Sequence, residues 1–457
     1  MDLLRKKSIE HVAQTSQDLL RCLSAFDLTL MGIGAIIGAG IFVITGVAAA
    51  MKAGPAIILS YVIAGFACLF SALAYAELAA SIGGCGSAYG YAFVGFGEII
   101  AWIVGWDLLL EYAISIAAVA VGWGSYVNDF LFALNIPKPY FFLRAPFAGL
   151  EVNFLAVLII IFLAGLLMLG VEASKRMNNM IVVFKLLVIG LFIVIAAAHM
   201  DPKNWTPFMP FGWVGVAQGA SLIFFAYLGF DAVSTSAEEA INPQRSLPIG
   251  IVGSLLVSTI LYILVSGLLT GIVSYQQLNV ASPISYALIL IGYKTTAGLI
   301  SVGAIAGLST VILVLFYGLS RIFFAMARDG LLPRFFSAVN SKTQTPIRII
   351  LLCALVVGLA AGLLPIQTLA DLVNIGTLFA FILVCSGVLL LRYFQPKLPR
   401  PFKTPFMPYT PILGIISCLY LIFNLPWFTI WRFIIWFILG IVIYFVFARK
   451  HSILNGV

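Results

Sequence analysis

Three ionisable side chains lie within long apolar stretches of this sequence. Lys185 lies in NNMIVVFKLLVIG, Glu111 in GWDLLLEY and Asp231 in FFAYLGFD. An ionised group at membrane depth is costly unless it faces protein or water, so such residues are candidates for proton coupling. Each also has a structural alternative. Lys185 could extend its side chain to the membrane surface, Glu111 could accept hydrogen bonds from hydroxyl groups, and Asp231 could cap a helix.

A glycine cluster lies in the first long apolar stretch. Residues 32–46, GIGAIIGAGIFVITG, contain five glycines and no charge, although glycine costs roughly 1 kcal/mol relative to alanine inside a helix. Close packing of two helices would explain Gly34 and Gly38, which have small-x-x-x-small spacing. The run Gly38-Ala39-Gly40 places small residues on several faces, whereas packing needs only one. We therefore expect the helix to unwind there.

A second interruption is expected in SLIFFAYLGFDAVSTSAEEAINP, residues 221–243, where Gly229 precedes Asp231 among aromatic residues. Glycine-interrupted helices at corresponding positions of two halves indicate an inverted-repeat transporter. The free N–H groups that begin the second part of a broken helix attract an anion. The free C=O groups that end the first part attract a cation. One broken helix can therefore bind the zwitterionic end of an amino acid without a charged side chain.

The composition indicates a membrane protein. The chain has 457 residues, of which 62% are hydrophobic and 9% charged, against about 25% charged in soluble proteins. Scanning for transmembrane runs gives twelve apolar segments. Lys and Arg are concentrated in the connections on the N-terminal side, so we expect both termini in the cytoplasm. The net charge of +8 then reflects orientation, and we expect no nucleic-acid partner.

Enzyme and channel functions are disfavoured by what the sequence contains. The three histidines lie at or beyond the ends of the apolar segments, which argues against a haem, quinone or zinc enzyme. The cysteines are scattered, and we interpret them as small apolar residues without a disulfide or metal role. A channel would need a continuous polar stripe or rings of charge, and the sequence shows neither. We expect no cofactor and no bound metal.

Several motifs together resemble a known family. They are GIGAIIGAGIF, SIGGCGSAYGYAF (81–93), GWDLLLEY (105–112), FFAYLGFDAVSTSAEEAINPQRSLP (224–248) and ARDGLLP (327–333). They resemble the amino acid–polyamine–organocation superfamily, and within it the bacterial relatives of the cationic amino acid transporters. The resemblance runs from about residue 23 to the C-terminus. It implies amino acid uptake, commonly driven by protons.

The fold that the resemblance implies is all-α and polytopic. It is a LeuT-type 5+5 inverted repeat plus two extra helices, with twelve transmembrane helices and with helices 1 and 6 unwound at mid-membrane. The expected division of the chain is a cytoplasmic N-terminal segment (1–26), a first five-helix repeat (27–199), a second inverted repeat (212–391), a cytoplasmic linker (392–408), helices 11 and 12 (409–448) and a cytoplasmic tail (449–457).

The resemblance also implies a substrate site at the two interruptions. The substrate carboxylate would meet backbone N–H groups of Gly38, Ala39 and Gly40. Relatives often carry Thr or Ser where this chain has Ala39, so the contact would rest on backbone alone. The carbonyl groups implied for the substrate ammonium are those near Ile37, Phe225, Ala226 and Leu228. The ring of Phe225 would close over the substrate as part of an outer gate.

A cation site is implied beside the substrate. In the family's proton-coupled members, a lysine at the position of Lys185 places its ammonium where sodium-coupled relatives hold Na⁺. Ser309 and Thr310 match the sodium-ligand positions of those relatives. The hypothesis is that Lys185 replaces the sodium ion and loads and releases the coupling proton.

The pocket for the substrate side chain would be lined by Phe225, Leu315 and the small residues around Ser115. Glu111 is the exception in this apolar lining. We therefore predict a plasma-membrane permease, from a bacterium, that takes up small or medium neutral L-amino acids with protons by alternating access. An amino acid exchanger and a cationic amino acid or polyamine permease of the same fold are the alternatives. The sequence does not show whether a small membrane protein or a sterol-like lipid binds.

Overall fold

The computed structural model describes residues 5–7, 21–84, 86–133, 152–280, 282–364 and 366–455. Over these residues the chain forms helices joined by turns and loops, and its one pairing of extended segments is an isolated parallel bridge between Leu23 and Ala240. The predicted all-α class is therefore confirmed.

The long helices follow one another in the order in which they are named here. They are α2 (Ala25–Ile36), α4 (Ile57–Ser81), α6 (Glu98–Ala133), α7 (Phe154–Met168), α8 (Val171–Ala198), α9 (Gly212–Ile223), α10 (Pro243–Ile272), α12 (Lys294–Arg328), α13 (Ile347–Leu363), α14 (Ile366–Phe394), α15 (Tyr409–Phe423) and α16 (Trp427–Ile443). Shorter elements are η1 (Gly40–Ile44), α3 (Thr45–Ala48), η2 (Ala49–Ala53), η3 (Gly54–Ala56), α5 (Ala88–Gly95), η6 (Phe224–Tyr227), η7 (Asp231–Ser236), α11 (Pro283–Leu290), η10 (Tyr444–Ala448) and α17 (Arg449–His451).

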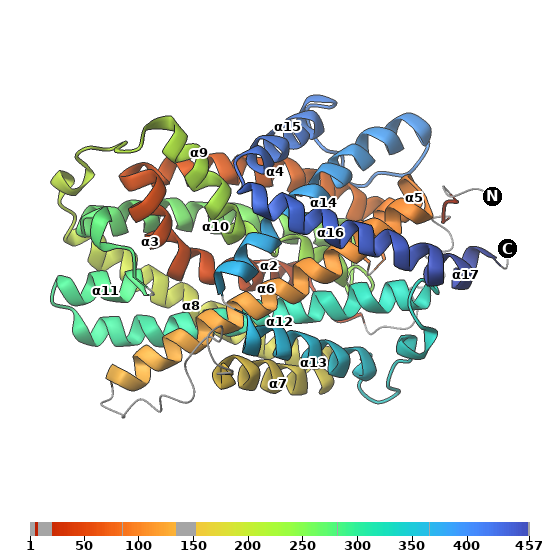
Figure 1. Cartoon of the computed structure of the whole chain (residues 1–457), viewed down its shortest axis with the longest axis horizontal. Coiled ribbons are helices and arrows are strands. Elements are labelled where there is room, and N and C mark those ends of the chain that lie inside the picture. The colour runs from red at the N-terminus through yellow and green to blue at the C-terminus, as the bar shows by residue number, and fades with distance from the viewer. Residues whose placement is uncertain are drawn as a thin grey trace.

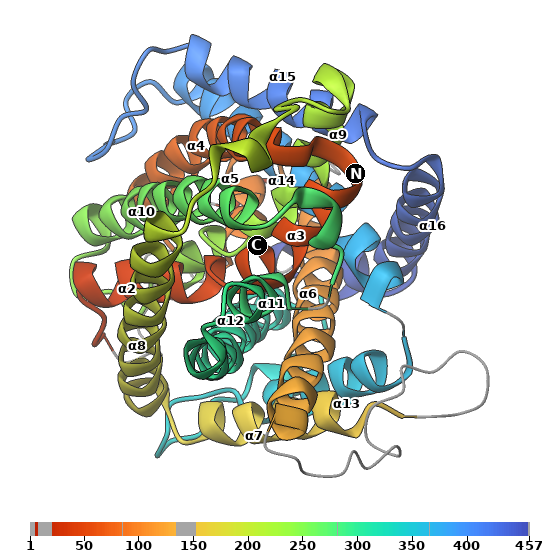
Figure 2. The same ribbon diagram turned by 90° about the vertical axis from the view of Figure 1, so that its left-hand side faces the viewer.

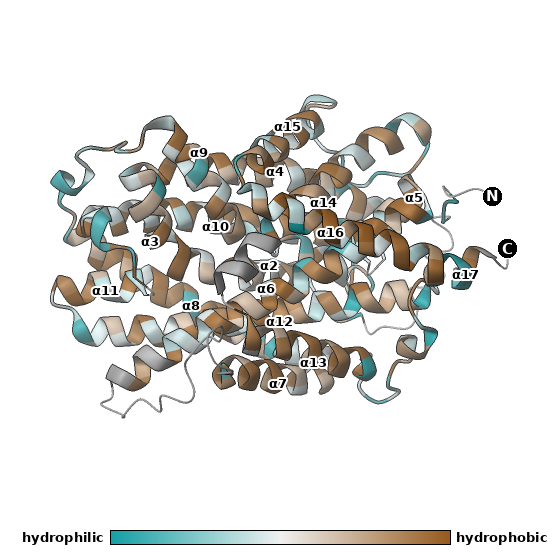
Figure 3. Ribbon diagram, in the orientation of Figure 1, coloured by the Kyte–Doolittle hydropathy of each residue, from teal (hydrophilic) through white to brown (hydrophobic). Residues whose placement is uncertain are grey.

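Eight helical segments of the described residues are long and apolar enough to cross a membrane. They are Ala25–Ser81, Glu98–Val127, Ser174–Ala198, Gly212–Ser236, Pro243–Ile272, Lys294–Arg328, Val373–Phe394 and Trp427–His451. Helices α7, α13 and α15 are apolar but shorter than 18 residues. Apolar residues predominate along the helices (Figure 3). The chain is a polytopic helical membrane protein.

The long helices run mostly along one axis of the molecule (Figure 1). Viewed along that axis, α12 lies near the centre, whereas α15 and α16 lie at the periphery (Figure 2). Helix α12 packs most extensively against α6, and α10 packs against α4 and α2. The core therefore forms between segments that are far apart in the chain, and α16 keeps most of its surface exposed.

Both ends of the described chain meet at the start of α6. The carboxylate of Glu98 is fully buried and accepts hydrogen bonds from Arg5 Nη2 at 3.1 Å, Tyr444 Oη at 3.0 Å and Ser452 Oγ at 2.7 Å. Arg5 also donates to the carbonyl of Leu454 at 3.1 Å. Residues 5–7 and α17 consequently lie at the same end of the molecule (Figure 1).

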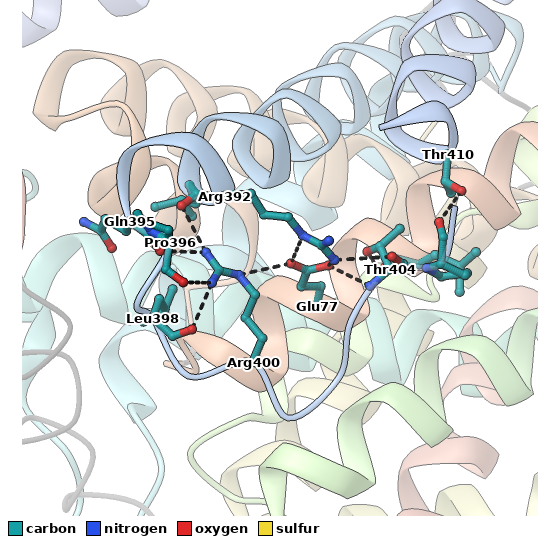
Figure 4. A network of polar contacts seen from close by, with 11 residues as sticks. Glu77, Arg392, Gln395, Pro396, Leu398, Arg400, Thr404 and Thr410 are labelled. Carbon is teal, nitrogen blue, oxygen red and sulfur yellow. Dashed lines mark hydrogen bonds and ion pairs between the residues drawn. The ribbon is translucent and has the colours of Figure 1, made fainter. Parts of the chain in front are cut away.

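A single carboxylate holds the connection between α14 and α15 (Figure 4). Glu77, near the end of α4, accepts hydrogen bonds from Arg392 Nε at 2.9 Å and Nη2 at 2.6 Å. It also accepts the backbone N–H of Thr404 at 2.7 Å, and Arg400 Nε lies 3.4 Å from it. Because α14 continues to Phe394, the connection is slightly shorter than the expected linker. Arg400 and Thr404 tie this connection to α4.

Candidate substrate and cation site

The first expected interruption coincides with a break between α2 and η1. Ser24 and Asp27 form a capping box that starts α2, and the helix ends at Ile36. Ile37 has an extended backbone with ψ 98°, and η1 begins at Gly40. The first N–H groups of a helix have no carbonyl partner within that helix. The break therefore presents backbone donors from the segment that starts η1.

The second interruption lies between η6 and η7. Leu228 has an extended backbone with ψ 142°, and Gly229 has φ +114°, a conformation that a residue with a side chain rarely adopts. A Cβ added to Gly229 would lie 2.5 Å from Ala35 Cβ. Gly229 is therefore required both by its backbone angle and by its contact with α2.

The two breaks touch each other. A Cβ added to Gly40 would lie 2.2 Å from the Cβ and 2.4 Å from the Cα of Ala226. Tyr262 Oη of α10 lies 2.6 Å from the carbonyl oxygen of Ile36 and 2.7 Å from that of Ala226. Its hydroxyl therefore bridges the end of α2 and the η6 segment. The two broken segments form one structural unit with α10.

Hydroxyl groups also satisfy the carbonyl of Gly40. Thr45 Oγ1 donates to this carbonyl at 2.9 Å, and Tyr61 Oη lies 2.6 Å from Thr45 Oγ1. No motif in the sequence singles out Tyr61, Tyr262 or Thr45. The available signal is that a buried tyrosine hydroxyl needs a partner, but the chain has 17 tyrosines, and this signal does not identify which carbonyl each one reaches.

Lys185 points at the first break from α8. The residue is fully buried, and its Nζ donates to the carbonyls of Gly34 at 3.0 Å and Ile37 at 2.8 Å and to Thr310 Oγ1 at 2.9 Å. Three acceptors match the three N–H groups of an ammonium. None of the ion pairs found among the described residues includes Lys185. Its side chain lies inside the protein and does not extend to the membrane surface.

Ser309 and Thr310 do not share this site. Thr310 Oγ1 lies next to Lys185, whereas Ser309 Oγ accepts from Trp123 Nε1 at 2.9 Å and donates to the carbonyl of Ile305 at 2.8 Å. Consecutive residues of an α-helix are rotated by about 100°. Of the predicted hydroxyl pair, only Thr310 therefore reaches the ammonium, and Ser309 faces α6.

An acidic cluster lies beside the second break. Tyr112 Oη is hydrogen bonded to the carboxylate of Asp231, which also accepts the N–H of Gly229 at 3.2 Å. Asp231 is the first residue of η7, and its carboxylate also interacts with the backbone N–H groups of Asp231 itself and of Ala232 at the start of that segment. Glu111 is buried and interacts electrostatically with Asp231 and with Asp107. Neither Asp107 oxygen, nor Oε2 of Glu111, has a hydrogen-bond partner within the described structure.

Comparison with known proteins identifies the family of the chain. The family model described as "Amino acid permease" matches residues 23–447. The chain belongs to the amino acid permease family. It is 49% identical to the branched-chain amino acid permease BcaP of Bacillus subtilis and 47% identical to the methylthioribose transporter of the same organism, and each match covers 99% of both chains. It is 37% identical to human cationic amino acid transporter 4, over 84% of this chain and 62% of the relative. The predicted superfamily is confirmed.

In this permease, three of the four carbonyls expected to receive the substrate ammonium already have partners. Ile37 accepts from Lys185, Ala226 lies against Tyr262 Oη, and the carbonyl of Phe225 accepts the N–H of Leu228 at 3.3 Å. A carbonyl oxygen can accept a second hydrogen bond, so these contacts do not exclude a ligand. The remaining predicted lining residues, Phe225, Leu315 and Ser115, are buried.

Proposed function

We propose that the protein is a proton-coupled amino acid permease of the bacterial cell membrane. It takes up small or medium neutral L-amino acids by alternating access. The observation that carries this proposal is the junction of the two broken helices, where backbone groups of both breaks and the Lys185 ammonium converge. Irregular backbone at membrane depth is tolerated where it lines a cavity or a ligand, and helix ends of this kind bind zwitterions.

We further propose twelve membrane crossings in a LeuT-type inverted repeat. Division of Ala25–Ser81 at η3 turns the eight long segments into nine, and α7, α13 and α15 bring the number to twelve. An even number of crossings agrees with the two chain ends lying at one end of the molecule (Figure 1). The bias of Lys and Arg assigns that end to the cytoplasm. The boundaries of the two repeats remain those expected from the sequence, 27–199 and 212–391.

The substrate is proposed to bind at the junction through backbone groups. Its carboxylate would accept the N–H groups at Gly38, Ala39 and Gly40, and its ammonium would lie near the carbonyls of Ile37, Ala226 and Leu228. A neutral side chain suits a pocket that contains Phe225 and Leu315. The name of the 49% identical relative, a branched-chain amino acid permease, supports a neutral amino acid as the substrate.

Lys185 is proposed to carry the coupling proton. As an ammonium it fills three acceptors around the first break. After it loses a proton, one of these acceptors loses its donor, so protonation is linked to the geometry of the break. Glu111 and Asp231 are proposed as further carboxylates that respond to substrate or proton binding beside the second break.

The test uses purified protein in liposomes with an imposed pH gradient, acidic outside. Branched-chain and other neutral amino acids are expected to accumulate in liposomes that contain the wild-type protein. The variant Lys185→Met should lose this accumulation, whereas Lys203→Met, which changes an exposed lysine, should retain it. Gradient-driven accumulation at the wild-type rate by Lys185→Met would refute the role of Lys185.

Two alternatives have distinct outcomes in the same liposomes. Exchange of internal for external amino acid without a response to the pH gradient would indicate an exchanger. Methylthioribose is a second candidate substrate because a relative with 47% identity is named for its transport. This molecule has neither a carboxylate nor an ammonium group, so its hydroxyl groups would have to make the contacts with the backbone N–H and C=O groups. Stabilisation of the protein against heat by methylthioribose, and by no amino acid, would favour it.

A further inference from the structure

A wide groove opens at the surface between α4, α10 and the α14–α15 connection. Its volume is about 790 Å³, within the range of about 300–1,000 Å³ that is usual for sites of small molecules. One wall is formed by α10, and the other by Leu73 of α4 and by Pro401 and Phe402 of the connection. None of the described residues that line it belongs to the substrate junction. The groove is therefore a separate candidate binding site.

The α10 wall changes from polar to apolar along the helix. Gln244 and Arg245 line the groove in the first turn, and Ile249, Val252 and Leu256 line it further along. The positions from Arg245 to Leu256 are spaced by four, three and four residues, which places them on one helix face. This part of α10 is about 16 Å long, roughly half of the ~30 Å hydrocarbon core of a bilayer. The groove thus has the length of one membrane leaflet.

The polar end of the groove carries a positive charge that the lining does not neutralise. Arg245 is exposed, and none of the ion pairs found among the described residues includes it. The described lining contains no Asp or Glu. Glu77, one turn after Leu73 on α4, is already paired with Arg392 at 2.6 Å. The chemistry of this end therefore favours an anion.

The wall opposite α10 is held in place by hydrogen bonds. Thr404 Oγ1 donates to the carbonyl of Leu73 at 3.1 Å, and the N–H of Thr404 donates to Glu77 at 2.7 Å (Figure 4). These two contacts fix the backbone two residues after Phe402 against α4. A ligand that enters the groove need not order the connection first, and a preformed site loses less affinity to ordering than a mobile one does.

The polar end lies toward the end of the molecule where the chain termini gather. Glu238, shortly before α10, is paired with Arg328 at the end of α12 at 2.9 Å. The next residue of that segment, Asp329, is paired with Lys7 at 2.6 Å. In the orientation proposed above, this end faces the cytoplasm. Arg245 then lies at the level of the lipid head groups of the cytoplasmic leaflet.

We propose that this groove binds one anionic phospholipid of the cytoplasmic leaflet. Its phosphate is bound by the guanidinium of Arg245 and the amide of Gln244, and one acyl chain lies along Ile249, Val252 and Leu256. A lipid fits better than a soluble anion because Ile249 and Leu256 are 47% and 46% exposed, so the apolar part of the groove is open to the membrane interior. A sterol has no phosphate for the arginine. The site depends neither on the substrate nor on proton coupling.

The first test measures lipid preference. Full-length protein in detergent is titrated with phosphatidylglycerol or phosphatidylcholine, and bound lipid is counted by native mass spectrometry. One phosphatidylglycerol should bind more tightly than phosphatidylcholine, and Arg245→Gln should weaken its binding about fivefold, the factor expected for one basic residue beside anionic lipid. Arg176→Gln, which removes an exposed arginine near the start of α8, should not. Equal binding of the two lipids by the wild type, or equal effects of the two variants, would overturn the proposal.

The second test locates the lipid. Phosphatidylglycerol with a diazirine on its acyl chain is irradiated with the protein, and the crosslinked residues are identified by mass spectrometry. Labelling should concentrate on residues 249–256. Val252→Trp, which fills the groove, should reduce this labelling severalfold, whereas Val257→Trp, at an exposed position of α10 outside the groove, should not. Labelling spread evenly over the apolar surface would indicate ordinary surrounding lipid, and labelling removed by cholesterol but not by unlabelled phosphatidylglycerol would indicate a sterol site. Either result would refute the assignment.

Discussion

The contact between the two helix breaks leads to a prediction for Gly40→Ala. The new methyl group would lie 2.2 Å from the Cβ and 2.4 Å from the Cα of Ala226. Carbon atoms in contact are about 3.5–4.0 Å apart, so the two backbones must separate by about 1 Å or more. Overpacking of this kind costs about 1–3 kcal/mol. If this free-energy cost reduces the binding of substrate, the affinity for substrate decreases about 5- to 150-fold.

The assay combines thermal unfolding of the purified protein with substrate binding at equilibrium. Gly122→Ala is the control, because a Cβ at Gly122 meets nothing within 4 Å. Gly38→Ala gives a comparison within the same break, since its Cβ would lie 2.3 Å from Val311 Cγ2. That contact is with the end of a side chain, so Val311→Ala should restore binding in the double variant.

The corresponding double variant, Gly40→Ala with Ala226→Gly, should not recover substrate binding. Ala226→Gly removes the Cβ of Ala226, but the Cα remains 2.4 Å from the added methyl group. Full recovery of binding by Gly40→Ala with Ala226→Gly would refute the reasoning, because it would show that backbone approach does not limit this position. Binding by Gly40→Ala alone at the level of Gly122→Ala would refute it as well.

Three further outcomes are expected from single side chains. Tyr262→Phe removes the hydroxyl shared by both breaks and should destabilise the protein by about 1–3 kcal/mol, measured by denaturant or thermal unfolding, whereas exposed Tyr420→Phe should not. Thr310→Val should weaken gradient-driven uptake in liposomes as loss of the lysine amine does, and Ser309→Ala should leave it intact; equal effects would contradict the assignment of the two hydroxyls. Glu77→Ala should free the α14–α15 connection and speed its cleavage by trypsin, and an unchanged digestion rate would show that other contacts hold this connection.

Hydropathy and glycine placement predict much of this fold. The length of each apolar run identifies the helical segments. In lipid there is no water to bind the backbone N–H and C=O groups, and a helix satisfies all of them within one segment. Gly38, Gly40 and Gly229 also mark where the two helices depart from regular geometry. A side chain at any of these positions would collide with a neighbouring segment, and at Gly229 it would also strain the backbone. These signals are local to the chain, so one sequence is sufficient to detect them.

Contacts between distant segments escape such a prediction. Tyr262 follows Ile36 by 226 positions, and the sequence near either residue does not indicate that the two form a hydrogen bond. Whether Ser309 or Thr310 faces Lys185 depends on the rotation of α12 about its axis. Hydropathy does not determine this rotation closely, because α12 is buried on most sides. Pairing partners are thus set by tertiary packing.

The gathering of both chain ends at Glu98 has a consequence for biosynthesis. This carboxylate is fully buried in the finished protein, and two of its partners, Tyr444 and Ser452, follow it by 346 and 354 positions. Because a chain is made from its N-terminus, α6 is synthesised long before these hydroxyls exist. Until the last helix is inserted, Glu98 can pair with Arg5, which is made earlier, but water or another molecule must take the places of Tyr444 and Ser452. A chain that ends before the last helix therefore lacks two of the hydroxyl donors that satisfy this buried carboxylate.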